Sequence, residues 1–96
     1  MKFEYVQYRD YVGNITIEND RMVFETDKKS VNPSELKLEI LFTDINRQKT
    51  KKHFTENNFM QNIVIETKNN KYEFRFRYID EYDKFLEFMK DLLFGE

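Results

Sequence analysis

The chain contains no cysteine, no tryptophan, one proline and only two glycines in its 96 residues. Without cysteine it can form no disulfide, hold no thiolate-bound metal and offer no thiol nucleophile. The two glycines, Gly13 and Gly95, stand far apart and cannot build a glycine-rich loop around a phosphate. Thiol chemistry and nucleotide binding of the P-loop type are therefore excluded, while the compartment is left open.

Long apolar stretches are also missing. No apolar run reaches the length of about 18 residues that would indicate a membrane-spanning helix, and the N-terminus, residues 1–5, lacks the apolar core of a signal peptide. We therefore expect a soluble cytoplasmic protein. The length fits one domain, residues 1–96. Ten Phe and six Tyr supply the bulk that a domain of this size needs for its core.

The formal net charge of −2 conceals two local imbalances. Residues 47–53 are basic, with Arg47, Lys49, Lys51 and Lys52 followed by His53 and no acid among them. Residues 80–91 are acidic on balance. Each stretch can be a solvated surface, and the basic one is also a candidate site for an anionic ligand.

Apolar and polar residues alternate on both sides of Asn19-Asp20, which predicts a β-hairpin over residues 13–25. Residues 27–35 are polar, contain Pro33 and are predicted to form a loop. A half-buried strand is expected over residues 36–42, since every second residue there is a large apolar one.

The second half of the chain also contains predicted strands, but its first residues include fewer apolar side chains. A further strand is expected to begin at residues 45–49, and residues 51–58 read as a polar loop. Two alternating strands follow, one around Ile63 and Ile65 and one over residues 72–77, joined by an Asn69-Asn70 turn.

The N-terminal segment, residues 3–11, is a plausible strand whose aromatic residues are irregularly spaced. The irregularity predicts a bulge or a change of strand partner. Two alternatives are open: an edge strand whose surplus aromatics dock a second copy or a partner strand, or a bulge that turns both faces into the core. The first makes Phe3, Tyr5 and Tyr8 candidate protein contacts.

A C-terminal helix is expected over residues 80–94. Asp80 is a suitable N-cap and Gly95 a suitable C-terminal stop. Six apolar residues recur at the spacing of one helical face: Tyr82, Phe85, Leu86, Met89, Leu92 and Leu93. We expect this stripe to cover an opening in the β-domain, because each large side chain gains about 1.5–3 kcal/mol on burial.

Three segments together resemble a GRAM domain or a related pleckstrin-homology-like (PH-like) domain. Residues 13–24 are similar to the opening hairpin of that family, in which a glycine starts an alternating strand. Residues 38–45 resemble its strand that ends in an aspartate-isoleucine pair, and residues 63–76 resemble its late hairpin with a Tyr-x-Phe-x-Phe strand. The resemblance implies a mainly β fold with one C-terminal α-helix: a PH-like barrel of two near-orthogonal antiparallel sheets, about seven strands, capped by that helix.

Domains of this family are mostly binding modules, so the resemblance implies a non-enzymatic binding or scaffold role, but it names no ligand. The family's lipid-binding residues lie around the first hairpin loop, which in this chain, residues 18–21, is acidic on balance. They cannot be carried over. The leading hypothesis is a protein–protein contact or self-association, to which Phe88 contributes because it lies off the apolar stripe of the helix.

The alternative is a weak contact between residues 47–53 and an anionic membrane, worth about 1 kcal/mol per charge. Nucleic-acid binding is disfavoured by the negative net charge. No small-molecule substrate, cofactor or metal is indicated. The only histidine, His53, has Glu56 three residues on, which is short of a three-ligand catalytic metal site, so we do not expect an enzyme.

Overall fold

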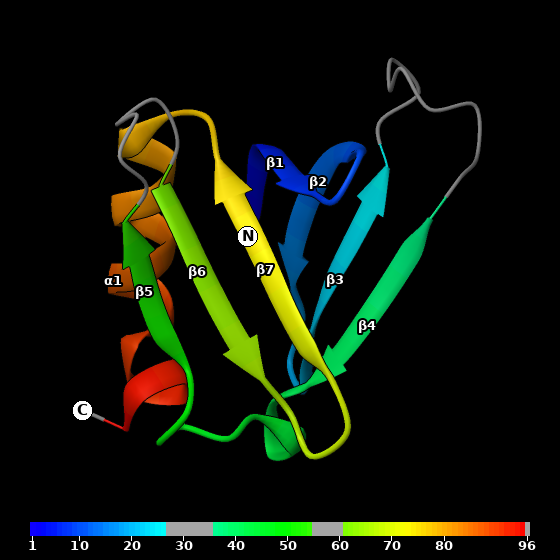
Figure 1. Cartoon of the computed structure of the whole chain (residues 1–96). Coiled ribbons are helices and arrows are strands. Elements are labelled where there is room, and N and C mark those ends of the chain that lie inside the picture. The colour runs from blue at the N-terminus through cyan, green and yellow to red at the C-terminus, as the bar shows by residue number, and fades with distance from the viewer. Residues whose placement is uncertain (27–35, 55–60, 96) are drawn as a thin grey trace.

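The computed structural model describes residues 1–26, 36–54 and 61–95, with the backbone alone for His53 and Phe54. In these residues one antiparallel sheet has the strand order β4-β3-β2-β1-β7-β6-β5 (Figure 1). Its strands are β1 (Lys2–Tyr8), β2 (Tyr11–Ile17), β3 (Arg21–Thr26), β4 (Lys37–Leu41), β5 (Lys51–Phe54), β6 (Gln61–Glu66) and β7 (Lys71–Phe76). A 3-10 helix, η1 (Phe42–Asp44), follows β4, and α1 (Ile79–Phe94) follows β7. The prediction of a mainly β fold with one C-terminal helix is confirmed.

The sheet is not closed. Within the described residues β4 pairs only with β3 and β5 only with β6, so these two strands form its edges. Figure 1 shows α1 beside β5 and β6, at the opposite end of the molecule from β4. The two ends of the sheet are therefore different: one adjoins the helix and the other does not.

Strand β1 lies inside the sheet, paired with β2 on one side and with β7 on the other. Its register with β2 shifts between Phe3 and Val6, and Tyr5, within the shift, has a left-handed φ of 58°. This bulge brings Phe3, Val6 and Tyr8 to one buried face. The predicted bulge is confirmed, but it does not turn both faces into the core, because the side chain of Tyr5 is 50% exposed. The alternative of an edge strand at residues 3–11 is wrong, because both neighbouring positions of β1 are occupied.

The core collects on one face of the sheet and contains two groups of aromatic rings. In the helix cluster, Phe3, Phe76, Tyr82 and Phe85 lie between α1 and the sheet, with 5.0 Å between the ring centroids of Phe76 and Phe85. In the sheet cluster, rings from β1, β3 and β7 meet without a helix, with 5.7 Å between the centroids of Phe24 and Phe74. Its members are Tyr8, Phe24, Tyr72 and Phe74.

Helix α1 begins earlier than predicted. Tyr78 is its N-cap residue and provides no side-chain cap, so the prediction of Asp80 as N-cap is wrong. Asp80 lies in the first turn instead, where its carboxylate still interacts favourably with the helix dipole. Gly95 ends the helix with a φ of 73°, and its N–H donates to the carbonyl of Asp91 (3.1 Å). The predicted glycine stop is confirmed.

The apolar stripe of α1 covers the sheet as predicted. Four of its residues are buried, namely Tyr82, Phe85, Met89 and Leu93, while Leu86 and Leu92 are partly buried against them. The hydroxyl of Tyr82 donates to the backbone carbonyl of Asn62 (3.1 Å) and ties the helix to β6. Burial raises the pKa of this hydroxyl to about 12, with a smaller contribution from the carboxylate of Asp83.

Residues 45–49 differ from the prediction. Ile45 makes a single bridge to Thr67 and does not begin a strand. The side-chain Oδ1 of Asn46 accepts hydrogen bonds from the backbone N–H groups of Gln48 (3.1 Å) and Lys49 (3.3 Å). This local hydrogen bonding favours a turn over an extended chain. The expectation of a strand start here is therefore wrong.

Residues 51–54, predicted as part of a polar loop, form strand β5. The reason lies in β6, whose residues 62–65 are all buried. A buried strand needs hydrogen-bond partners on both sides, and β5 supplies the second set. The remainder of that predicted loop, and the predicted loop at residues 27–35, lie outside the described residues.

Both predicted turns occur, one of them displaced. Asn19-Asp20 joins β2 to β3, and the N–H of Glu18 donates to the carbonyl of Arg21 (2.9 Å). The turn between β6 and β7 centres on residues 68–69, one position before the predicted one, because Thr67 and Asn70 pair with each other.

Candidate functional site

A groove of about 550 Å³ lies between the edge strand β5 and helix α1. It lies within the range of about 300–1,000 Å³ that is usual for ligand pockets. The residues that line it are Lys52, Asp83, Leu86, Glu87, Lys90 and Phe94. We call these six residues the β5–α1 groove.

Strand alternation places Lys52 in the groove. Lys52 is paired with Ile63, whose side chain is fully buried in the core beneath α1, so the side chain of Lys52 is on the helix side of the sheet. Lys51 is paired with Val64 and belongs to the other face. An inward-directed charge on an edge strand hinders pairing with any foreign strand that does not accommodate that charge. In this chain it also adds a cation to the groove.

The helical wall of the groove combines apolar and charged groups. Leu86 and Phe94 are partly buried against the core and provide apolar surface. The ammonium of Lys90 lies 3.3 Å from the carboxylate of Glu87, one turn along the same face. Asp83 and Lys52 are exposed. An apolar floor with charges of both signs at its rim suits an amphipathic segment better than a simple anion.

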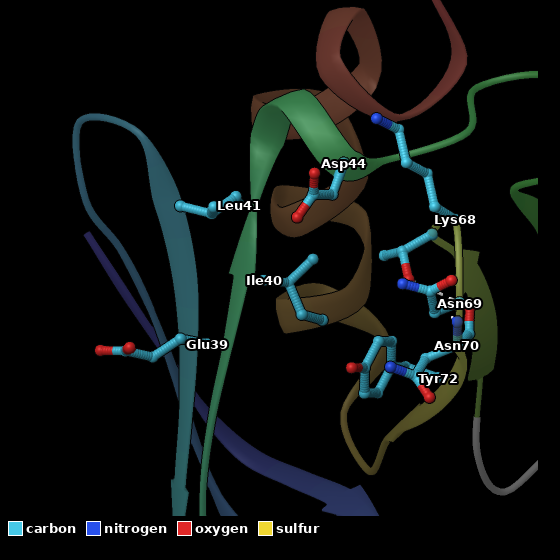
Figure 2. A pocket seen from close by; sticks show the side chains of 9 residues that line it. Glu39, Ile40, Leu41, Asp44, Lys68, Asn69, Asn70 and Tyr72 are labelled. Carbon is cyan, nitrogen blue, oxygen red and sulfur yellow. Dashed lines mark hydrogen bonds between the residues drawn. The ribbon is translucent and has the colours of Figure 1, made fainter.

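A smaller cleft, about 250 Å³, separates the end of β4 and η1 from the turn between β6 and β7 (Figure 2). Figure 2 shows Ile40 and Tyr72 on opposite walls and the carboxylate of Asp44 directed into the cleft. Lys68, Asn69 and Asn70 stand on the turn side. At this cleft, β4 and η1 diverge from the turn between β6 and β7. An isolated β-bridge between Ile45 and Thr67 joins the two parts of the chain nearby.

The predicted anionic-ligand residues do not form one site. The Nε of Arg47 donates to the carbonyl of Leu92 (3.2 Å), so this guanidinium closes the C-terminal end of α1. Lys49 lines a third hollow, of about 310 Å³, beside the β6–β7 turn. Lys51 and Lys52 are on opposite faces of β5. The sequence places these four charges within six residues, but strand alternation and a helix contact separate them.

The predicted protein contacts also divide. Phe3 and Tyr8 are buried in the core, whereas Tyr5 and Phe88 are 50% and 49% exposed. The ring of Tyr5 meets that of Tyr78 edge to face, with 5.2 Å between the centroids. Only Tyr5 and Phe88 of the predicted four are thus exposed to a partner.

An exposed ion-pair network holds the start of β3. The guanidinium of Arg21 makes two hydrogen bonds to the carboxylate of Asp20 (both 3.0 Å) and lies 3.5 Å from that of Glu39 on β4. The hydrogen bond from Arg21 lowers the pKa of Asp20, and the same contact raises the pKa of Arg21. One guanidinium thus serves two carboxylates, and the three charges connect the start of β3 to β4.

Two negative findings apply to residues 1–26, 36–54 and 61–95. In this part of the chain no three or more His, Asp or Glu side chains lie close enough together to hold a metal ion. No helix there is long and apolar enough to cross a membrane. A scan against protein-family models and a search of curated proteins find no match to this chain.

Sequence reasoning missed the groove because it missed β5. Asp83 and Glu87 belong to the acidic stretch of residues 80–91, and Leu86 belongs to the predicted apolar stripe of the helix. Lys52 falls in the loop predicted over residues 51–58. Residues 51–54 have little apolar character, so β5 could be inferred only from the need of the buried strand β6 for a second neighbour.

Proposed function

We propose that this chain is a non-enzymatic binding module that takes a short amphipathic segment of a partner protein in the β5–α1 groove. The observation that carries the proposal is the composition of the groove. Partly buried Leu86 and Phe94 lie beside Lys52, Lys90, Asp83 and Glu87, in a hollow of about 550 Å³. An apolar centre within a polar rim is the usual anatomy of a protein interface.

Strand β5 adds a second means of recognition. It pairs only with β6 among the described residues, so its other backbone edge can bond to an extended chain. Main-chain hydrogen bonds then supply affinity. Every second side chain of the bound segment points into the groove, and these contacts supply specificity.

We also propose that the fold is a PH-like, GRAM-like barrel in an open form. Supporting this are two series of consecutive antiparallel strands, β1–β4 and β5–β7, followed by a helix that covers the core. The proposal includes that these two series of strands form two near-orthogonal sheets.

Contact with an anionic membrane through residues 47–53 is the weaker alternative. Arg47 is engaged with the helix, and Lys51 and Lys52 are on opposite faces of β5. Without a joint basic surface, the summed electrostatic attraction that lipid binding needs is reduced.

The test is to select peptides from a random displayed library on the purified chain and to measure their affinity for variants. Lys52→Glu reverses a charge in the groove, and Lys51→Glu makes the same change on the other face of the same strand. We expect the first to weaken binding about tenfold, or 1.4 kcal/mol, and the second to change it less than about twofold.

Equal effects of the two substitutions would contradict the groove as the binding site. Failure to select any peptide, with salt-sensitive binding to phosphatidylserine vesicles instead, would favour the membrane alternative. Thermal unfolding of both variants controls for stability, and both positions are exposed.

A further inference from the structure

Among the described residues, the edge strand β4 presents an open row of backbone groups. The N–H of Thr26 donates to the carbonyl of Leu36 (3.0 Å), and beyond the other end of the strand the N–H of Phe42 donates to the carbonyl of Asp20 (2.9 Å). Hydrogen-bonded and non-hydrogen-bonded pairs alternate along an antiparallel ladder, so these two bonds determine which residues of β4 bond to β3. They are the even-numbered residues of β4. The N–H and C=O groups that point away from β3 belong to Lys37, Glu39 and Leu41.

The outward side chains of β4 alternate in charge with those of β3. The Nζ of Lys37 lies 3.8 Å from the carboxylate of Glu25, and the carboxylate of Glu39 lies 3.5 Å from the guanidinium of Arg21. Lys37 and Glu39 are both exposed. On the opposite face, Leu38 is partly buried and Ile40 is buried in the core.

This pattern is complementary to itself in one register. If β4 pairs antiparallel with β4 of a second copy, allowed registers differ by two residues, because only odd-numbered residues offer open groups. One register sets Lys37 opposite Lys37, and another sets Glu39 opposite Glu39. Like charges directly opposite each other are destabilising.

The register between these two sets Lys37 of each copy opposite Glu39 of the other, twice by symmetry. It also brings Leu38 against Leu38 on the core side, at a pair without hydrogen bonds, where side chains approach most closely. Across the joined sheets the charges then run Glu25, Lys37, Glu39 and Arg21, with the last two from the second copy. Signs alternate throughout.

We propose that β4 is a self-association edge, at which two copies of this chain join their sheets with Lys37 opposite Glu39. A charged residue on an edge strand usually prevents such pairing. Two opposite charges two residues apart instead select one partner and one register. The arrangement has a two-fold axis, so it ends at a dimer and does not continue into a fibre. The interface is one short strand, which predicts a weak dimer.

The proposal is tested by sedimentation of the wild-type chain and of two charge-reversal variants. Glu39→Lys sets lysines opposite lysines, and Lys37→Glu sets glutamates opposite glutamates, so each variant alone should dimerise at least about tenfold more weakly. An equimolar mixture of the two should form a heterodimer, because every opposed pair is then of opposite sign. Glu18→Lys, with the same charge change in the exposed β2–β3 turn, should behave like the wild type.

A measurement on the unaltered chain covers the case in which a variant does not fold. Amide exchange at Lys37 and Glu39 should slow as the wild-type concentration rises, while exchange at exposed Lys68 should not change. At a chain concentration of about 1 mM, even a dimer with a free energy of association of −4.1 kcal/mol would be detectable. A wild-type chain that is still monomeric at this concentration therefore overturns the proposal. A mixture no more dimeric than its components also overturns it.

Discussion

The two halves of the core are held together by different means. In the helix cluster, Phe85 of α1 contacts Phe3 and Phe76 of the sheet, and the hydroxyl of Tyr82 bonds to β6. In the sheet cluster, the rings come from strands alone. The helix acts as a cover on one side, whereas on the other side the rings of β1, β3 and β7 pack on one another, and Tyr72 of this cluster lines the cleft of Figure 2.

This difference shows where the chain can vary its surface without loss of its core. Beside α1, the helical side chains that bound the β5–α1 groove stand on a helix whose buried residues pack against the sheet, so the groove has a firm support. At the β4 end α1 does not adjoin the strand, and the surface there includes the strand edge, η1 and the polar turn between β6 and β7. Stability experiments should therefore separate the two halves.

The largest effect is expected in the helix cluster. Phe85→Ala removes a fully buried ring and should lower the free energy of unfolding by about 3–5 kcal/mol. Leu86→Ala, one residue along, changes a partly buried groove residue and should cost less. Urea denaturation followed by circular dichroism measures both values. Equal costs would show that α1 does not seal the core through Phe85.

A substitution in the sheet half should have the next largest effect. A Cβ added at Gly13 would collide with the backbone carbonyl of Glu25 and come within 2.9 Å of the Cα of Thr26. Because both contacts are to backbone, β2 and β3 must separate, and Gly13→Ala should cost about 3 kcal/mol. A melting temperature close to that of the wild type would show that the strands are not so close.

The hydrogen bond between helix and sheet should make a smaller contribution that depends on pH. Tyr82→Phe should cost about 1 kcal/mol at pH 7, since it removes a buried hydrogen bond between helix and sheet. The pKa of Tyr82 is raised to about 12 by burial, so the folded chain keeps this proton after the unfolded chain loses it near pH 10. Its contribution is therefore complete below pH 10 and is lost as the pH rises towards 12.

Denaturation of the wild type and Tyr82→Phe at several pH values between 8 and 12 checks that sign. The difference in stability between the two proteins should shrink as the pH rises through this range. A difference that stays constant would mean that the hydroxyl is solvated, and the helix would then be bound by apolar contacts alone.

The smallest effect is expected for the ion pairs at the β2–β3 turn. Arg21→Gln removes contacts to Asp20 and Glu39, but both carboxylates are largely exposed. Exposed pairs contribute about 0.2–1 kcal/mol, and high salt should reduce the difference further. A cost well above that range would indicate that Arg21 also supports the β3–β4 pairing.

The sequence predicted the elements whose pattern is local. Helix α1 has an apolar stripe and a terminal glycine, and the β2–β3 hairpin has alternation on both sides of Asn19-Asp20. The bulge in β1 was also foreseen, because the spacing of Phe3, Tyr5 and Tyr8 fits neither face of a regular strand.

Elements that depend on distant partners were not predicted. Strand β5 has little apolar character of its own and exists because buried β6 needs a second neighbour. The role of Arg47 depends on the helix end that it contacts 45 residues later. The groove could not be predicted for the same reason, since it joins one residue of β5 to five residues of α1.

The most direct test of the proposed function is an NMR titration of the isotope-labelled chain with a selected peptide. We expect the largest amide shift changes at Lys51 and Lys52 and along residues 83–94, on both walls of the β5–α1 groove. Shift changes concentrated instead at the cleft of Figure 2, around Asp44 and Tyr72, or at the exposed pair of Tyr5 and Tyr78, would contradict the account.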